Sequence, residues 1–392
     1  MTVPGLDVAA NFTCAVDAWV ERWPPAAVPL GRAQYKTRAA DFKVVERPLP
    51  AAQVQRLDAV AGAPQRLFNI RKTGINTTYV VQLLARWASI APVEVGYAGR
   101  KDRHAITQQW FSVPDHAVRK ALDSNGAFAS YAAPLLQDAE TLEVVAQAGQ
   151  QRKLRVGELA GNDFEVTLRD LSFEQDSAPG AALESALQAL TQRGVPNYFG
   201  AQRFGRDNLD QALAWLAGQA DPSRRRKAGR RRKARGSGAG SALDGGWQRS
   251  ILRSYLFNQV LAARVVDGTF AESIAGDVLA VDGRAATAPL WGRGRSSADA
   301  QALAVEESAL APYAALCSAL EHTGLNQQRR ALCVWPENLS WRLDGDQLQL
   351  RFGLPSGAYA SVLLEELFTL TDAAVLSTDE AARSAPGFGP KA

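Results

Sequence analysis

The sequence predicts an α+β fold, because strand-like and helix-like periodicities both occur along its 392 residues. Residues 106–113 alternate between polar and apolar side chains, as a half-buried strand does. Residues 77–88 place apolar side chains on one helical face, and Asn76 is a suitable N-cap for that helix. Asp344-Gly345-Asp346 lies between two predicted strands and is a clear hairpin signal. The chain therefore combines sheet and helix.

The remaining elements follow from the same patterns, taken in chain order. Residues 180–193 carry leucines at helical spacing. Residues 194–205 are too rich in glycine and aromatic side chains for a regular element. Strands are expected at residues 38–46, 66–71, 141–146, 152–158, 339–343 and 347–352, and helices at residues 116–122, 249–266, 298–310, 312–323 and 361–369.

Composition indicates a globular protein with a sizeable core, since 46% of the residues are hydrophobic and 21% are charged. No apolar run reaches the length of a membrane span, and the first residues lack the pattern of a signal peptide. The three cysteines are widely spaced and only three histidines occur, so neither a disulfide framework nor a metal site is expected. We expect a cytoplasmic protein with no membrane contact.

The positive charge is concentrated in one run. Nine lysines and arginines lie between Arg224 and Arg235 with no acid among them, so the rest of a chain of net charge +4 carries −5. This run continues into a stretch of glycine, serine and alanine that cannot bury apolar surface. We expect a disordered basic loop at about residues 222–246 that attracts phosphates without specificity, or a solvated loop with no partner.

The stretch from Gly96 to Trp110 presents a single acid, Asp102, between Lys101 and Arg103. Glycines before the acid and a strand after it would hold the carboxylate at a sheet edge, where a ligand can come close. The flanking cations favour the ionised acid, which suits a nucleophile better than a proton donor. On local composition alone, a polar hairpin with a solvated ion pair is the better explanation.

Several motifs favour the nucleophile over the solvated ion pair. The stretch around Asp102 resembles the signature of the TruD family of tRNA pseudouridine synthases, which runs Ala-Gly-x-Lys-Asp-x-x-Ala-x-Thr-x-Gln. Further family-like strings occur in order along nearly the whole chain. The matching residues are Ala98, Gly99, Lys101, Asp102, Ala105, Thr107 and Gln109, then Asp41-Phe42, Lys72-x-Gly74-x-Asn76-Thr77, Gly161-Asn162-x-Phe164 and Leu354-Pro355-x-Gly357-x-Tyr359-Ala360-Ser361, where the family usually has threonine at the last position.

The resemblance implies a role for each matched side chain. Asp102 would be the catalytic nucleophile. Phe42, Phe164 and Tyr359 would be aromatic residues of the substrate pocket, and Asn162 would bind the imide edge of a uracil taken out of its helix.

Some of these residues have a simpler interpretation. Without the resemblance, Phe42 and Phe164 would be core aromatics and Gly161-Asn162 a turn. Lys72 could contact a phosphate or the catalytic acid, or be a solvated lysine. Contacts with the RNA backbone are expected from Lys72, Lys101, Arg103, His104 and Arg203.

The resemblance also implies the domain organisation. A pseudouridine synthase catalytic domain with a mixed β-sheet and flanking helices would comprise residues 1–193 and 336–392. An α/β TRUD domain, residues 194–335, would be inserted within it. This arrangement would let residues from distant parts of the sequence share one cleft.

The implied reaction is isomerisation of uridine to pseudouridine in RNA, most simply at uridine 13 in the D arm of tRNA. The C1′–N1 bond breaks and C5 bonds to C1′, which needs no cofactor. The protein would act on tRNA as a monomer without a protein partner. Two rivals remain: an RNA-binding protein or chaperone on the same scaffold without catalysis, and a glycosidase. A glycosidase needs a second acid near Asp102, and Glu94 and Asp115 are poorly spaced for that role.

Overall fold

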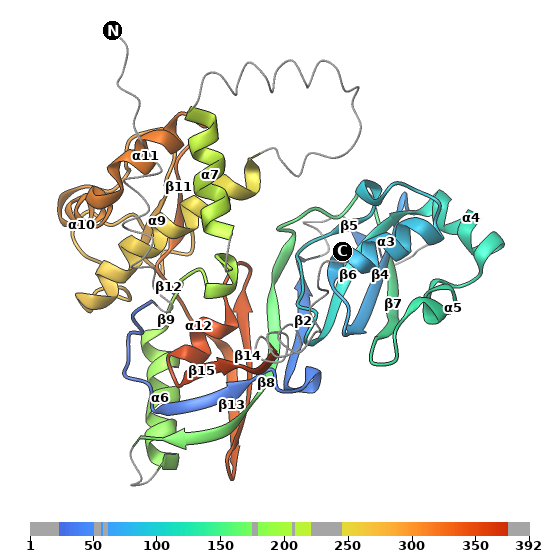
Figure 1. Cartoon of the computed structure of the whole chain (residues 1–392), viewed down its shortest axis with the longest axis horizontal. Coiled ribbons are helices and arrows are strands. Elements are labelled where there is room, and N and C mark those ends of the chain that lie inside the picture. Colours follow the sequence, from blue (N-terminus) through green and yellow to red (C-terminus); the bar gives the residue numbers. More distant parts are fainter. Residues whose placement is uncertain are drawn as a thin grey trace, which may run out of the picture. The chain divides into compact units, whose positions relative to one another are not determined.

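The computed structural model describes residues 23–50, 56–57, 62–174, 179–205, 208–220 and 245–374, so the basic run of residues 224–235 lies outside the described residues. Figure 1 shows the chain, which divides into two compact units. The first, here called the sheet unit, comprises Pro29–Thr191, Pro336–Ala360 and the residues from Leu367 on. The second, the helical unit, comprises the residues up to Val28 together with Gln192–Trp335 and Ser361–Glu366.

An eleven-stranded mixed sheet forms the sheet unit, in the order β13-β14-β8-β2-β6-β4-β7-β3. Short β5 pairs with β6, and β1 joins β8 to β15. The pairs β2–β6 and β1–β15 are parallel, and the other pairs are antiparallel. This confirms the predicted α+β class. The strands are β1 (Gly31–Tyr35), β2 (Phe42–Pro48), β3 (Arg56–Leu57), β4 (Gln65–Thr73), β5 (Gly96–Tyr97), β6 (Ile106–Pro114), β7 (Thr141–Gln150), β8 (Leu159–Phe173), β13 (Glu337–Asp344), β14 (Gln347–Pro355) and β15 (Thr369–Asp372).

The strand register brings residues from three distant segments onto one face of the sheet. Val44 of β2 lies opposite Phe164 of β8 and Thr107 of β6. Phe164 in turn lies opposite Phe352 of β14. Because alternate residues of a strand share a face, the same face also carries Phe42, Glu46, Lys72, Gln109 and Asn162.

Three helices of the sheet unit cover part of this face. They are α3 (Thr77–Trp87), α4 (Asp115–Asn125) and α5 (Phe128–Ala132). Figure 1 shows α3 lying across β6 and β4. Helix α3 begins as the sequence predicts, since the Asn76 side chain accepts a hydrogen bond of 2.8 Å from the backbone N–H of Tyr79. Its buried side chains join Phe68, Ile70 and Phe111 of the strands in one apolar core.

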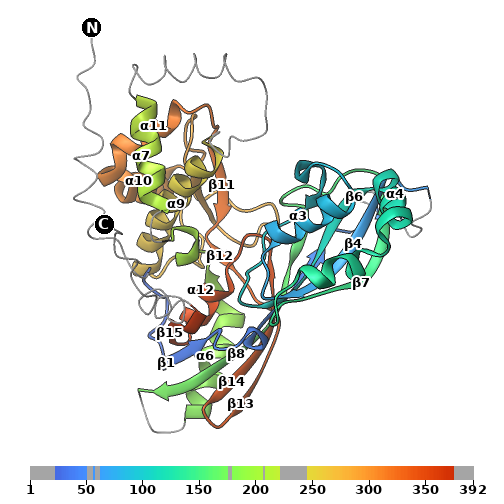
Figure 2. The same cartoon turned by 45° about the vertical axis from the view of Figure 1, so that its right-hand side comes forward.

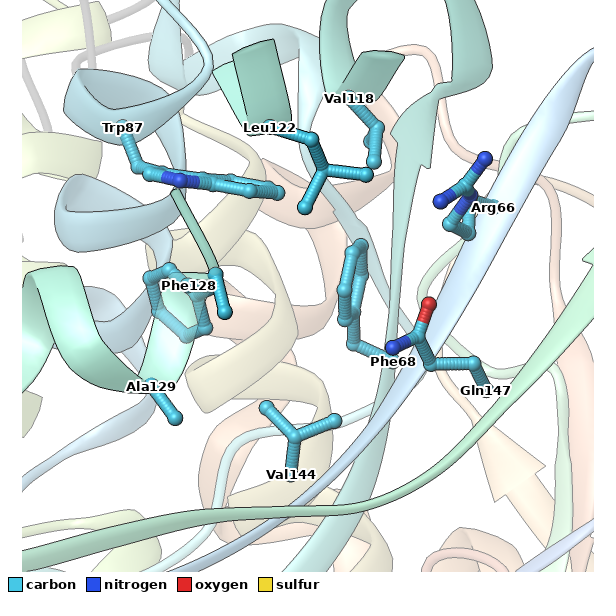
Figure 3. A pocket seen from close by; sticks show the side chains of 10 residues that line it. Arg66, Phe68, Trp87, Val118, Leu122, Phe128, Ala129, Val144 and Gln147 are labelled. Atoms are coloured by element: carbon cyan, nitrogen blue, oxygen red, sulfur yellow. The ribbon is translucent and has the colours of Figure 1, made fainter. Parts of the chain in front are cut away.

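A small cavity of about 120 Å³ lies within this core. Figure 3 shows the rings of Phe68, Trp87 and Phe128 around it, and Arg66 at its margin. Arg66 is held by two hydrogen bonds to one oxygen of Asp115, at 2.9 and 2.6 Å. The cavity is walled mainly by the apolar core and is part of its packing.

The helical unit is built around α9 (Gly246–Val266), which buries residues on several sides. Figure 2 shows α7 (Asn208–Ala220), α10 (Ala300–Leu310) and α11 (Ala314–Glu321) gathered with it near β11 (Gln328–Ala331). Strand β11 pairs with β10 (Thr287–Leu290), and β9 (Val195–Pro196) pairs with β12 (Cys333–Val334). A buried ion pair of 2.9 Å joins Arg264 to Asp277. Two further helices, α6 (Pro179–Arg193) and α12 (Ala360–Glu365), are made of residues assigned to both units.

Most predicted elements are present, and three predictions are wrong in identifiable ways. The expected strand at 152–158 is a turn, in which Glu158 receives a hydrogen bond from the backbone N–H of Arg155 and donates one back from its own N–H. The strand expected from residue 38 begins at Phe42, because Asp41 caps a 3-10 turn over Ala39–Asp41 and pairs with Arg169. The helix expected to reach 369 ends at 365, because the chain then forms β15. Across the described ranges, no helix is both long and apolar enough to cross a bilayer.

Candidate active site

Asp102 lies in the loop that joins β5 to β6. The two strands pair directly, with Gly96 opposite Ser112, so both ends of the loop are fixed by the sheet. A side chain at position 96 would not fit, since its Cβ would lie 2.3 Å from Ser112 Oγ and 2.4 Å from Leu154 O. The Asp102 side chain is 42% exposed. The loop therefore presents one carboxylate to the outside from an anchored position.

Lys36 holds that carboxylate. Its Nζ lies 2.9 Å from Asp102 Oδ2, and the lysine side chain is only 9% exposed. The same Nζ lies over the ring of Phe42, 4.8 Å from its centroid, and over that of Tyr35 at 5.3 Å. Ring faces attract a cation, so the aromatic residues fix the lysine and the lysine fixes the acid. No local sequence pattern indicates Lys36, which lies 66 residues before Asp102.

Lys72 supports the backbone of the same loop. Its side chain is completely buried, and its Nζ donates to Ile75 O at 2.6 Å and to Asp102 O at 3.1 Å. Burial lowers the pKa of Lys72 to about 8, against the opposing effect of the Asp102 charge. The expected contact with RNA phosphate and the solvated-lysine interpretation are both at odds with this burial. Of the three interpretations, contact with Asp102 is the one that the structure shows, through the backbone carbonyl of Asp102.

Lys101 is likewise turned inward. Its Nζ lies 3.0 Å from Glu46 Oε2, and the two side chains are 6% and 1% exposed. The other Glu46 oxygen accepts a hydrogen bond of 3.2 Å from the backbone N–H of Trp110. The expectation that Lys101 contacts the RNA backbone therefore fails on burial. The lysine instead ties the loop to β2, because Glu46 belongs to that strand.

A second set of hydrogen bonds links the loop to helix α3. Thr77 Oγ1 accepts from the backbone N–H of Lys101 at 2.9 Å and donates to Gln109 Oε1 at 2.8 Å. Gln109 Nε2 donates to Gly99 O at 2.9 Å. Two loop residues before Asp102 are thus held by hydrogen bonds, Lys101 to the first residue of α3 and Gly99 to β6, although the loop has no regular structure of its own.

Phe42 and Phe164 form part of a buried aromatic row beneath Lys36. They are 5% and 9% exposed, and their rings meet edge to face at 6.1 Å. Phe164 stacks on Phe352 at 5.3 Å. The structure therefore brings Phe42, Phe164 and Asp102 together through Lys36, with both rings in the core. Their direct contact with a substrate base remains a prediction.

Asn162 is half-buried on β8, opposite Glu46 and Leu354. The Gly161-Asn162 pair lies inside the strand, so the alternative of a turn is wrong. Asn162 Oδ1 is buried and accepts no hydrogen bond from any described residue. A buried acceptor without a donor costs about 1–3 kcal/mol, and a ligand N–H would remove that cost.

Tyr359 follows the end of β14 and is half-buried. The turn that carries it is bonded to the start of β8, because the N–H of Ser356 donates to Ala160 O at 3.2 Å. Tyr359 thus lies on a segment anchored close to the strand position of Asn162, since Pro355 pairs with Gly161. This juxtaposition joins the C-terminal part of the sequence to the Asn162 motif.

The remaining predicted RNA contacts separate into two groups. Arg103 and His104 are exposed and line a cavity of about 590 Å³ beside the Asp102 loop. Arg203 belongs to the helical unit, where its guanidinium lies 4.4 Å from the ring centroid of Trp247 and bonds to Ser250 Oγ. Among the residues that the structure describes, no group of three or more His, Cys, Asp or Glu side chains could hold a metal ion.

Comparisons with known proteins show to which family the chain belongs. The family model described as tRNA pseudouridine synthase D (TruD) matches residues 31–214. Proteins named tRNA pseudouridine synthase D from Aeromonas salmonicida and Xanthomonas campestris pv. campestris are 35% and 37% identical, over 88% and 87% of this chain and 93% of each relative. A crystal structure from Methanosarcina mazei, assigned as a TruD protein, has the same fold, with a TM-score of 0.56 at 18% identity over 91% of this chain and 97% of its own. The chain belongs to the tRNA pseudouridine synthase D (TruD) family.

Proposed function

We propose that this chain isomerises uridine to pseudouridine in tRNA, at uridine 13 of the D arm, acting as a monomer. The observation that carries the proposal is the state of Asp102. Its carboxylate is accessible, yet its position is set by Lys36 at the side chain and by Lys72 at the backbone. Such preorganisation is what a reaction at a bound sugar carbon requires.

The reaction breaks the C1′–N1 bond of the nucleoside and joins C5 of the uracil to C1′. A proton leaves C5 and N1 gains one, so nothing is consumed. Asp102 can form a transient bond to C1′ as the base departs, or take a proton from the sugar in an elimination. Positive character develops on the sugar in either case, as in glycoside hydrolysis, and a fixed carboxylate stabilises it.

Three further side chains support this assignment. Asn162 offers a buried acceptor for which the uracil imide N–H is a suitable donor. Tyr359, on the segment anchored beside β8, is proposed as an aromatic wall that keeps the detached base close. Phe42 is proposed to act mainly by holding Lys36, since its ring lies under the ammonium.

The test is Asp102→Asn in the full-length protein, incubated with unmodified tRNA. Pseudouridine is mapped by carbodiimide modification, and RNA binding is measured separately. The variant should form no pseudouridine while it binds tRNA as the unmodified protein does. Asp344→Asn is a matched control, because this acid is 71% exposed on the β13–β14 hairpin of the same unit. Wild-type turnover by Asp102→Asn would refute the proposal, and tRNA binding without any modification by the unmodified protein would favour the chaperone.

A further inference from the structure

The cavity beside the Asp102 loop has the size and position of a substrate subsite. Its volume of about 590 Å³ falls in the usual range for small-ligand pockets. It lies wholly within the sheet unit, where the 37–39 turn, the end of β4, residues 103–104 and the 137–140 turn meet. Lys36 contributes to its wall and also bonds to Asp102. The cavity therefore shares a side chain with the proposed catalytic centre.

The charged groups of this wall are not all neutralised by one another. Lys36 is paired with Asp102, and Arg103 lies 3.5 Å from Glu140 and donates to Gly74 O. Asp138 adds a second, exposed carboxylate. Arg38 is exposed, and its side chain has no ion pair with any residue of the described ranges. Its backbone serves the turn, because its N–H donates to Asp41 Oδ2 and its carbonyl accepts from Asp41 N–H, both at 3.0 Å.

The lining favours a phosphate and ribose over a base. Of the described residues that line it, none is Phe, Tyr or Trp, so no large ring face is present on which a base could stack. An arginine guanidinium on a rigid turn suits a phosphate, which it can bind with two hydrogen bonds. His104, which is exposed beside Arg103, adds a ring nitrogen to the same wall.

We propose that this cavity holds the nucleotide next to the target uridine, with the connecting phosphate bound by Arg38. The inference rests on the proposed function. An RNA strand that delivers a uridine to Asp102 must continue on one side of it, and the cavity wall that shares Lys36 with Asp102 offers a cationic path for that strand. Arg38 would then contribute to binding and register of the RNA, while the chemistry stays with Asp102.

The test compares Arg38→Gln with Arg119→Gln, using the full-length protein and unmodified tRNA. Arg119 is 70% exposed on α4, beyond the far end of β6, and its partner Asp115 keeps Arg66. The first and last residues of β6, Ile106 and Pro114, are eight residue steps apart, which is roughly 26 Å. Arg38→Gln should weaken tRNA binding about tenfold, with saturated turnover unchanged, and lower the salt slope by about 0.7–1. Arg119→Gln should change neither.

A neutral methylphosphonate in place of one phosphate identifies the contact. At the flanking phosphate that Arg38 binds, this replacement should weaken tRNA binding by the unmodified protein about tenfold. It should not weaken binding by Arg38→Gln any further. Unchanged binding by Arg38→Gln, or additive losses at both flanking phosphates, would overturn the proposal. A fall in saturated turnover alone would also overturn it. Failure of the unmodified protein to form pseudouridine would instead refute the proposed function, since binding is measured independently.

Discussion

Replacing Lys72 by methionine separates the positioning of Asp102 from the stability of the sheet unit. Methionine has nearly the length of lysine and keeps the apolar contacts of the stem, but it donates no hydrogen bond. The backbone carbonyls of Ile75 and Asp102 both lose their ammonium donor. We expect the position of Asp102 to become less well defined, while the hydrogen bonds that hold Lys101 and Gly99 remain.

The substitution has two opposing effects on stability, and its effect on kcat is a loss. A pKa lowered from 10.5 to about 8 by burial means that the charged Lys72 costs the folded state about 3 kcal/mol at neutral pH. Methionine removes this cost and leaves two carbonyls without a donor, at about 1–3 kcal/mol each. The free energy of unfolding should therefore change by at most about 3 kcal/mol. A displacement of Asp102 by about 1 Å can lower kcat on the order of 100-fold.

Alkaline pH provides the same perturbation without a mutation. Between pH 8 and 10.5 the folded protein holds fewer protons on Lys72 than the unfolded chain does, so this group's contribution to stability rises with pH and is lost as pH falls through about 8. Turnover should instead fall as pH rises through about 8, because the neutral amine holds the Asp102 carbonyl less strongly. Arginine stays charged, so Lys72→Arg should move the alkaline fall in kcat to higher pH.

Single-turnover pseudouridine formation, measured from pH 6.5 to 9.5 alongside thermal unfolding, checks both trends. The Lys72→Met variant should be slow at every pH and should lose the inflection near pH 8. A purely structural lysine would instead change the unfolding midpoint and leave the pH profile of kcat in place. Lys72→Met with the kcat of the unmodified protein would refute the assigned role.

Two further predictions concern stability. Gly161→Ala would place a Cβ 2.2 Å from Leu354 O, so β8 and β14 must shift, and we expect a loss of about 1–3 kcal/mol in the free energy of unfolding. The control is Gly180→Ala on α6, where the added Cβ meets no other atom and should not lower stability. Equal unfolding midpoints for the two variants would contradict this reasoning. Burial raises the pKa of Glu366 to about 7 from 4.5, so its stabilisation is present below pH 4.5 and is lost as pH rises through 7. Glu366→Gln should flatten that slope of the unfolding midpoint with pH, and an unchanged slope would rule the group out as its origin.

The local elements of the fold were predictable because their causes are local. Helix α3 follows from the Asn76 cap and an apolar stripe, and the β13–β14 hairpin follows from its Asp-Gly turn. The turn at 152–158 was mistaken for a strand because its polar contacts join residues three apart, which leaves no periodic signal. The start of β2 was misplaced because Asp41 is held by Arg169, 128 residues later.

The candidate site likewise has features that local sequence predicts and features that depend on distant residues. The motif around Asp102 predicts the catalytic acid, but it does not indicate that Lys101 points into the core, since a Lys-Asp-Arg run is usually solvated. Burial of Lys101 depends on Glu46, which reaches it only through the pairing of β2 with β6. Lys36 gave no signal at all, because a lone lysine acquires meaning only when the sheet places it over Phe42.

These contacts explain how an exposed loop can carry a preorganised acid. In the proposed reaction Asp102 meets a nucleoside, which excludes fixing the carboxylate by burial of its own side chain. The structure instead buries three lysines around it: Lys72 and Lys101 are desolvated, and Lys36 nearly so. Desolvating lysines is unfavourable, and each here is compensated by a carboxylate, a carbonyl or an aromatic face. The position of Asp102 is thus set by its neighbours, and its carboxylate stays accessible for the proposed reaction.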